Sequence, residues 1–295
     1  GRGSHPAVTD PNGRPVGATF LRNNLNKQSL AIDLKHPEGV DLVLHLAQRF
    51  DVFGENFRAG TADRLGIGYE AVRATHPAVV YLSISGFGQD PASPYRDMGA
   101  YAAIVEGMSG IYEYKRAPGR PPAANPVGAL GDISSALFGA VGVLAALRHR
   151  DHTGVGQHID VAMLDATVAM TDIVANFHSL GVEREWGSGI GIVETFAASD
   201  GHFVLQCVRE HHFATLCTEI GCPELADDER FATRAGWQDH LDDVLRPAIE
   251  SWASDRPLAE VVGILSGAGM ACGPSQTSAQ VVADPHLAVR NMLVE

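Results

Sequence analysis

Residues 125–150 read NPVGALGDISSALFGAVGVLAALRHR and place one acid, Asp132, between a glycine turn and a long apolar run. The run over residues 133–147 predicts a largely buried helix, and the cations of residues 148–150 suit the negative end of its dipole. At the helix start, Asp132 is typical of an N-cap, whose side chain accepts hydrogen bonds from free backbone amides. The alternative is a reactive carboxylate, which those amides and the dipole would keep ionised and beside which Gly128 and Gly131 leave room for another molecule. The local pattern leaves both interpretations open.

The chain as a whole has 295 residues, enough for two domains or one large one, and a formal net charge of -13. This charge argues against nucleic acid or an anionic membrane as the main partner, although an anionic small ligand needs only a local cluster of cations. The longest apolar run is too short and too often interrupted by Gly and Ser to predict a membrane span. The four cysteines have neither CxxC nor metal-ligand spacing, so we expect reduced, mostly buried thiols in a cytoplasmic protein.

Strand and helix signals alternate on both sides of this stretch. Upstream they predict strands at 29–34, 51–54 and 78–88, a helix that begins near Pro37 and a helix over about 62–74. Downstream, RHRDHTGVGQHIDVAMLDATVAM predicts a charged turn, a short strand and another helix. Alternation of this kind is typical of an α/β domain with a parallel sheet, whose ligands bind at the carboxyl ends of the strands. We assign residues 1–180 to this large domain.

The composition and periodicity of the sequence change near residue 180. Residues 181–192, GVEREWGSGIGI, are rich in glycine and lack periodicity, which favours a linker or a mobile loop. The following VETFAASDGHFVLQCV predicts a hairpin, and several amphipathic helices come after it. Residues 193–295 therefore form a smaller α+β domain.

Most of the other candidate motifs lack the residue spacing of a known functional site. GFG and GSGIG lack the spacing of a dinucleotide fingerprint, no GxSxG motif is present, and Glu210, His211 and His212 have no HExxH spacing, so we predict no metal site. Asn56, Phe57 and Arg64 follow a predicted strand, where an amide, an aromatic ring and a guanidinium could hold a purine and a phosphate.

Read in order, the segments resemble one family. NNLNKQSLAIDLKHPEG, DVFGENFRAGTADRLGIGYE, VVYLSISGFGQDP, YAAIVEGMSG, the stretch from Gly128 to Ala166 and ADPHLAVRNMLVE are similar to the class III coenzyme A transferases, which include formyl-CoA and carnitine-CoA transferases and the α-methylacyl-CoA racemases. The resemblance covers nearly the whole chain and is strongest over residues 24–166. It implies a Rossmann-like parallel sheet in the large domain, a smaller α+β domain, and a homodimer of two interlocked rings.

The resemblance also implies a reaction. Asp132 would attack an acyl-CoA thioester, and the resulting mixed anhydride would become an aspartyl-CoA thioester from which a carboxylic acid takes the CoA. Backbone amides near Gly131 could stabilise the oxyanions. Ile32, Lys35, Asn56, Phe57 and Arg64 match positions that line the CoA site, with Lys35 and Arg64 facing phosphates, and Tyr101 matches an active-site tyrosine. The loop at Gly187–Gly191 matches only weakly the one that shields the acyl intermediate.

Two departures from the family pattern leave alternatives open. Gln28 stands where the family has a cation, and the family's usual opening strand–helix–strand segment and its continuation beyond the position of Glu295 lie outside this sequence, so we expect a chain clipped at both ends. One alternative is an α-methylacyl-CoA racemase, in which Glu210 would match a further acid. That reading has Tyr101 where a racemase has a histidine base, and tyrosine, with a pKa near 10, is a poor base at neutral pH. The other alternative is an inactive CoA-binding fragment.

Overall fold

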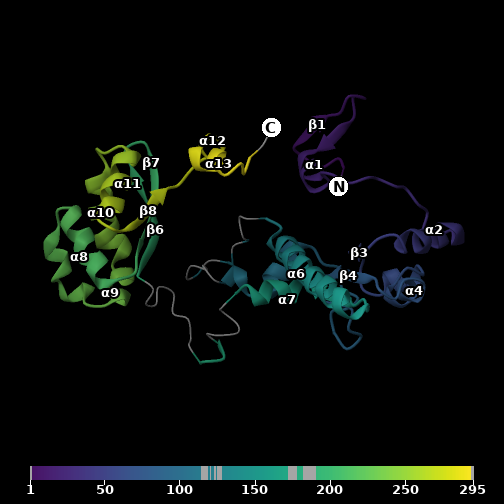
Figure 1. Cartoon of the computed structure of the whole chain (residues 1–295). Helices are drawn as coiled ribbons and strands as arrows, with labels where there is room; N and C mark the ends of the chain where they lie inside the picture. The colour runs from purple at the N-terminus through teal and green to yellow at the C-terminus, as the bar shows by residue number, and fades with distance from the viewer. Residues whose placement is uncertain are drawn as a thin grey trace. The chain divides into compact units, whose positions relative to one another are not determined.

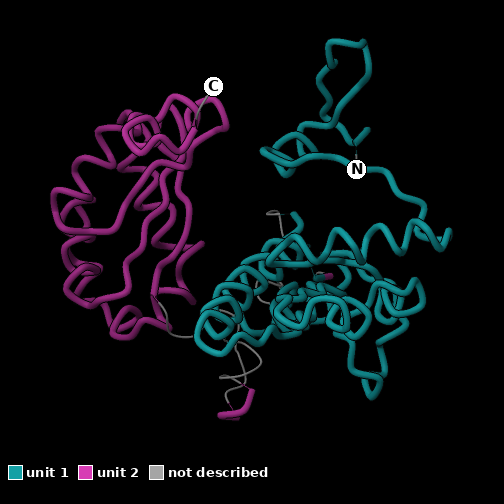
Figure 2. The backbone as a smooth tube through the Cα atoms, turned by 45° about the vertical axis from the view of Figure 1, so that its right-hand side comes forward, with its two compact units in different colours: residues 1–114, 122–176 teal, residues 115–121, 177–295 magenta. Residues whose placement is uncertain are grey.

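The computed structural model describes residues 2–113, 119, 121–122, 124, 128–171, 178–181 and 191–293. The chain divides into two compact units (Figure 2), and each is described by itself. Unit 1 comprises residues 1–114 and 122–176, and unit 2 comprises residues 115–121 and 177–295. Most of the predicted linker at 181–192, including the Gly187–Gly191 loop, lies outside the described residues.

Unit 1 is built on a parallel sheet in the order β3-β4-β5. Strands β3 and β4 are labelled in Figure 1. The strands are β3 (Val52–Glu55), β4 (Val80–Ser85) and β5 (His158–Ala162). The central strand β4 pairs with a strand on each side, and all of its residues are buried or half-buried. The predicted parallel sheet is therefore confirmed, and it brings together segments that are far apart in the sequence.

Helices join and flank these strands. The other described elements of unit 1 are β1 (Ala7–Thr9), β2 (Pro15–Gly17), α1 (Ala18–Asn23), α2 (Pro37–Ala47), α3 (Thr61–Arg64), α4 (Tyr69–Thr75), α5 (Ala102–Met108), the 3₁₀ helix η1 (Ile111–Glu113), α6 (Leu130–Thr153) and α7 (Met163–Ala169). Pro37 begins α2, as predicted. The single helix predicted over 62–74 is wrong, since it is split into α3 and α4 by Gly66, whose positive φ of 77° is incompatible with a continuous helix.

The strand predicted at residues 29–34 is also wrong. These residues form neither strand nor helix, and Leu30 remains 65% exposed. An alternating pattern becomes a strand only where a neighbouring strand completes the hydrogen-bond ladder, and none of the described strands pairs with this segment.

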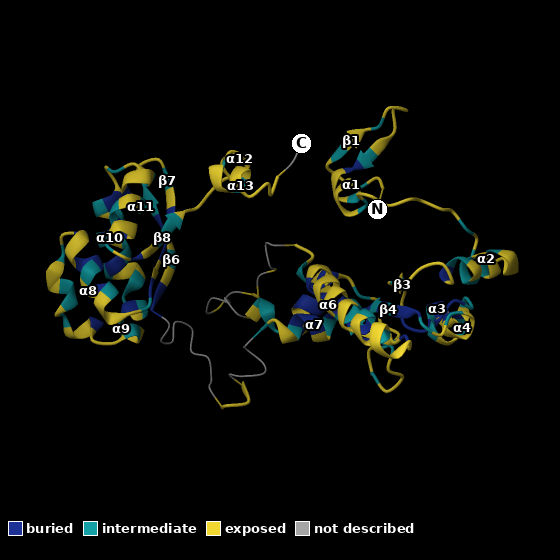
Figure 3. Ribbon diagram, viewed as in Figure 1, coloured by how far each residue is buried: buried dark blue, intermediate teal, exposed yellow. Residues whose placement is uncertain are grey.

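Helix α6 packs on the sheet through its smallest residues, which corrects the prediction that it is largely buried. Gly139 lies against Leu82, and Gly142 lies against Ile159. The large apolar side chains of Ile133, Leu137, Phe138, Val141 and Leu144 are exposed instead, and much of the helix is coloured as exposed in Figure 3. Small residues face the sheet because they let the helix backbone approach it closely.

Helix α6 is also long and apolar enough to cross a membrane by length and composition alone, the only such helix in the described chain, contrary to the expectation from the sequence. Its contacts with β4 and β5 show that it covers the sheet of unit 1. A helix that covers a sheet passes the same test of length and composition, so the result by itself does not indicate a membrane span.

Unit 2 contains an antiparallel sheet in the order β6-β7-β8, made of β6 (Ile192–Ala198), β7 (Gly201–Cys207) and β8 (Ala271–Pro274). The predicted hairpin is confirmed, since β6 and β7 pair antiparallel across a short turn. The helices described in unit 2 are α8 (Glu210–Glu219), η3 (Pro223–Ala226), η4 (Glu229–Phe231), α9 (Arg234–Asp239), η5 (Leu241–Leu245), α10 (Arg246–Ala253), α11 (Leu258–Gly267), α12 (Ser278–Val282) and α13 (Pro285–Val289).

The core of unit 2 is large and aromatic. Phe213 and Trp237 stack with their ring centroids 4.4 Å apart, and the Trp237 indole donates a hydrogen bond of 2.7 Å to the carbonyl of Phe231. The four cysteines all lie in this unit as free thiols, of which Cys207 and Cys217 are buried. Burial raises the pKa of both buried thiols to about 12, so they are protonated at neutral pH.

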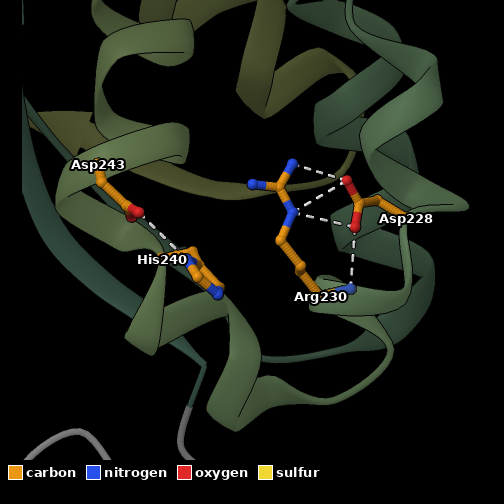
Figure 4. A network of polar contacts seen from close by, with 4 residues as sticks. All are labelled: Asp228, Arg230, His240 and Asp243. Carbon is orange, nitrogen blue, oxygen red and sulfur yellow. Dashed lines mark hydrogen bonds and ion pairs between the residues drawn. The ribbon is translucent and has the colours of Figure 1, made fainter.

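A polar network stabilises the surface turns of unit 2 (Figure 4). Arg230 pairs with Asp228 at 2.8 Å, and the Asp228 carboxylate also accepts a hydrogen bond from the Arg230 amide. The Nδ1 atom of His240 lies 3.2 Å from Oδ2 of Asp243. Each acid has its partner within three residues on the surface, so we interpret the network as structural.

Candidate active site

A cavity of about 620 Å³ opens in unit 1 at the carboxyl ends of all three parallel strands. Residues 56–59, which follow β3, and residues 84–86 at the end of β4 form part of its wall. Residues 96 and 98–101 before α5, together with Asp132 and Ala136 of α6 and Met163 of α7, complete it. The ends of parallel strands are the usual place for ligands in open α/β sheets, as the sequence predicts.

Asp132 lies on this wall, but it is not the N-cap of α6. The helix begins at Leu130, so Asp132 is its third residue, and the N-cap position belongs to Ala129, whose φ is 54°. Ala129 has no side chain that can accept a capping hydrogen bond. The prediction of Asp132 as a cap is therefore wrong, and its carboxylate is available to the cavity.

Glu106 supplies the missing acceptor. It lies on α5 with 2% of its surface exposed, and its Oε1 accepts a hydrogen bond of 3.1 Å from the backbone amide of Gly131. Its Oε2 accepts a hydrogen bond of 3.0 Å from the Tyr112 hydroxyl. A carboxylate from another helix thus satisfies one of the free amides at the start of α6.

The surroundings of Gly131 correct the expectation that this glycine leaves room for a ligand, and they remove its own amide from the candidates for stabilising an oxyanion. A methyl group on Gly131 would lie 2.7 Å from Val105 Cγ2, so the glycine permits close packing of α6 on α5 and does not make room for a ligand. The Gly131 amide already donates to Glu106, so it is not free to stabilise an oxyanion.

The electrostatic setting of Asp132 also differs from the expectation. Partial burial, and secondarily the negative charge of Glu106, raise the pKa of Asp132 above its ordinary value of 3.8. The side chain remains accessible to solvent, because it forms part of the cavity wall. The local environment therefore makes this carboxylate more basic than an ordinary aspartate, instead of favouring its ionised form.

Four of the predicted site residues come together at the cavity. Asn56 and Phe57 reach it from the loop after β3, Tyr101 from the N-cap of α5, and Asp132 from α6. Tyr101 is 84% exposed and Phe57 is 37% exposed, so both rings present surface that a ligand could cover.

The other three predicted residues do not line the cavity. Ile32 and Lys35 lie in the irregular segment before α2, and the Lys35 side chain is exposed. Arg64 lies at the end of α3, where its Nη2 donates a hydrogen bond of 2.8 Å to Thr61. These positions are suited only to the part of a ligand that extends beyond the cavity.

Two arginines that line the cavity, Arg58 and Arg96, are not predicted by the sequence motifs. The Arg58 guanidinium lies against Gly99, where a methyl group would be 2.7 Å from its Nη2. Arg96 is held by a hydrogen bond of 3.2 Å from its Nε to the Gln89 carbonyl. Arg58 could have been found from its place directly after Asn56 and Phe57, whereas the turn segment SPYRD around Arg96 carries no comparable signal.

Outside the cavity, Glu210 of unit 2 forms a two-pronged ion pair with Arg234. Its Oε1 and Oε2 accept hydrogen bonds of 2.9 and 3.1 Å. Hydrogen bonds from its own backbone and from Arg234 lower the pKa of Glu210. Among the described residues, no group of three or more His, Cys, Asp or Glu side chains is arranged to hold a metal ion.

Comparison with known proteins identifies the family. A family model described as CoA-transferase family III matches residues 3–295. The chain belongs to this family. The match confirms the resemblance found in the sequence and makes the protein an enzyme of the CoA-transferase class.

Individual relatives agree with this assignment. The chain is 34% identical over 284 residues to the acetyl-CoA:oxalate CoA-transferase of Acetobacter aceti, a match that covers 92% of this chain and 70% of the relative. It is 32% identical over 306 residues to the succinyl-CoA:mesaconate CoA-transferase of Haloarcula hispanica, covering 100% of this chain and 75% of the relative. A crystal structure of a CaiB/BaiF family protein from Brucella suis matches with a TM-score of 0.85 at 32% identity, covering 99% of this chain and 77% of that one.

Proposed function

We propose that this CoA-transferase moves coenzyme A from an acyl-CoA thioester to a carboxylic acid through a covalent intermediate on Asp132. The observation that carries the proposal is the position of Asp132 on the wall of a cavity at the strand ends, free of any capping role. Its raised pKa supports the same role, because a more basic carboxylate is a stronger nucleophile.

The proposed reaction has four steps and leaves Asp132 unchanged. A carboxylate oxygen of Asp132 attacks the thioester carbonyl, the C–S bond breaks, and a mixed anhydride and CoA thiolate form. The thiolate attacks the aspartyl carbonyl, which releases the first carboxylic acid as its anion and leaves an aspartyl-CoA thioester. The acceptor carboxylate attacks this thioester to give a second anhydride and thiolate. Attack of the thiolate on the acceptor's acyl carbon then releases the new acyl-CoA and frees Asp132, so the energy of the thioester bond is conserved.

The remaining site residues would bind the substrates. Asn56, Phe57 and Tyr101 surround the reacting end of CoA within the cavity, while Ile32, Lys35 and Arg64 contact the part outside it, with the two cations facing phosphates. Arg58 and Arg96 place two guanidiniums on the cavity wall, which suits carboxylate groups of the acid substrates. The relatives named for oxalate and mesaconate act on dicarboxylic acids, and we propose an acid of this class as the acceptor.

We further propose that the enzyme works in the cytoplasm as an interlocked homodimer. Residues 1–180 would form the CoA-binding domain, residues 181–192 a linker and residues 193–295 the smaller domain. The exposed apolar face of α6, formed by Ile133, Leu137, Val141 and Leu144, supports an assembly in which a second chain covers it.

The racemase alternative needs two acid/base groups, one on each face of the α-carbon. The cavity pairs Asp132 with Tyr101 rather than with a histidine, and Glu210 is held by Arg234. No observation in the described chain therefore favours the racemase over the transferase.

Trapping of the intermediate tests the proposal. The enzyme is incubated with an acyl-CoA and hydroxylamine, and Asp132 is examined by peptide mass spectrometry for a hydroxamate. We expect the adduct on Asp132 and none in Asp132→Asn. Full transferase activity without an adduct, or rapid α-deuterium exchange into a 2-methylacyl-CoA without an acceptor acid, would contradict the proposed function. An absence of both turnover and adduct would favour the inactive CoA-binding fragment.

A further inference from the structure

The proposed reaction assigns no role to Glu106, whose carboxylate is buried in unit 1. Both of its oxygens accept hydrogen bonds from neutral donors, the Gly131 amide and the Tyr112 hydroxyl. Within the described chain, no Lys, Arg or His forms an ion pair with it. A buried acid without a cation is costly, so its presence next to a reactive site calls for a functional explanation.

The position of Glu106 connects it directly to Asp132. Glu106 accepts a hydrogen bond from the backbone amide of Gly131, which precedes Asp132 in the first turn of α6. The same glycine packs against Val105 and Ala102 of α5, so the two helices are in close contact at the residue before Asp132. Glu106 therefore holds the start of α6 from the protein interior, while Asp132 remains on the cavity side.

We propose, on the basis of the proposed transfer reaction, that Glu106 is a positioning residue with two effects on Asp132. It takes over the capping of α6 and so leaves the Asp132 carboxylate free for the substrate. Its negative charge also makes that carboxylate a stronger nucleophile toward the thioester.

The charge effect follows from the direction in which charge moves. When Asp132 attacks, its negative charge passes to the thioester oxygen and then to the departing sulfur. A fixed negative charge nearby raises the energy of the ionised aspartate more than that of the later states, because in those states the charge lies farther away. The raised pKa of Asp132, caused by burial and then by Glu106, is consistent with this effect.

Other charged groups at the cavity do not strengthen Asp132 in this way. The guanidiniums of Arg58 and Arg96 line the same wall, where they suit the negative charge of a bound acid. Tyr112 is kept protonated, because burial and Glu106 raise its pKa. Glu106 is thus the described anionic group that strengthens Asp132 as a base.

The variant that separates this role from a structural one is Glu106→Gln. The glutamine oxygen can still accept from the Gly131 amide, so the cap is kept while the charge is lost. Tyr112→Phe is the matched partner, because it removes one hydrogen bond and keeps the charge. Glu38→Gln on α2 makes the same chemical change at an exposed position outside the cavity.

The experiment measures kcat and KM for acyl-CoA against pH in the three variants and the wild type. We expect Glu106→Gln to lower kcat by roughly twofold to tenfold with little change in KM and to move the acid limb of the profile to lower pH. Tyr112→Phe and Glu38→Gln should keep the acid limb of the wild type. A Glu106→Gln profile identical to the wild type would overturn the inference.

Two further measurements keep the result decisive. If Glu106→Gln fails to fold by circular dichroism, the wild-type profile still tests the inference, because an acid limb at or below 3.8 would contradict a strengthened Asp132. Hydroxamate trapping on wild-type Asp132 runs in parallel. An absent adduct would overturn the proposed function, whereas an adduct together with an unchanged Glu106→Gln profile would overturn only the role of Glu106.

Discussion

The two units of the chain use their apolar residues in different ways. In unit 2, one continuous cluster of 17 buried residues joins the antiparallel sheet to the helices that cover it. In the described part of unit 1, buried residues form two clusters of four, and the longest helix turns its large apolar side chains outward. Unit 2 is therefore stabilised by its own core, whereas unit 1 combines a small core with the cavity of the proposed active site and an uncovered apolar face.

The largest effect should come from the cavity of unit 1. Asp132→Ala is expected to lower transferase activity by roughly a thousandfold or more, since it removes the proposed nucleophile, with the fold unchanged. Steady-state assays and circular dichroism measure the two quantities. Activity within tenfold of the wild type would show that Asp132 is not the nucleophile.

Unit 2 should lose stability when a large side chain in its core is removed. Trp237→Ala removes a ring stacked on Phe213 and leaves the Phe231 carbonyl without its hydrogen bond. We expect the free energy of unfolding of unit 2 to fall by about 3–5 kcal/mol. Denaturant titration followed by circular dichroism measures it. Trp252→Ala, at a half-buried position on α10, is the control and should cost less; equal losses would refute a core centred on Trp237.

The exposed face of α6 tests whether unit 1 is completed by a second chain. Val141→Asp places a charge in the middle of this face, which would be buried without a partner in the proposed dimer. We expect dissociation or loss of soluble dimer in sedimentation velocity. Leu42→Asp on α2, which is 44% exposed, should leave the assembly unchanged. An intact Val141→Asp dimer would place the interface elsewhere.

The smallest expected effect is on the pH dependence of the free energy of unfolding. Replacing one acid in each unit should change this free energy in opposite directions at pH 7. The pKa of Asp132 is raised in the fold, so the folded state binds more protons and stability falls as pH rises through that range. Asp132→Asn should therefore raise the free energy of unfolding at pH 7, by under about 1 kcal/mol because solvent screens the exposed carboxylate. This gain should vanish in acid, below the ordinary pKa of aspartate.

Asp228 is the matched acid of unit 2. Its hydrogen bonds with Arg230 lower its pKa, so its contribution to stability is present above the ordinary aspartate pKa and is lost as pH falls through the lowered value. Asp228→Asn should thus lower stability at pH 7. Unfolding titrations at several pH values measure both variants, and the same sign for the two would contradict these pKa directions.

The sequence by itself determined those features that depend on local pattern. Apolar runs separated by helical periods predict the parallel strands β3, β4 and β5, and the hairpin of β6 and β7 follows from two alternating segments around a short turn. The motif around Asn56, Phe57 and Asp132 indicated the family and the end of the sheet at which the cavity lies. These signals are reliable because each is carried by neighbours within one or two turns or strands.

Only the tertiary structure decided what depends on residues far apart in the chain. Glu106, 25 residues before Gly131, accepts the hydrogen bond at the start of α6 that the local pattern predicts for Asp132, and no pattern near Asp132 shows this. Residues 29–34 alternate like a strand but find no partner in the described sheet, and the glycines of α6 turn its small face to β4 and β5 and its large side chains outward. Capping, strand pairing and burial are properties of contacts between segments, so only the fold shows which carboxylate satisfies an amide at the start of α6.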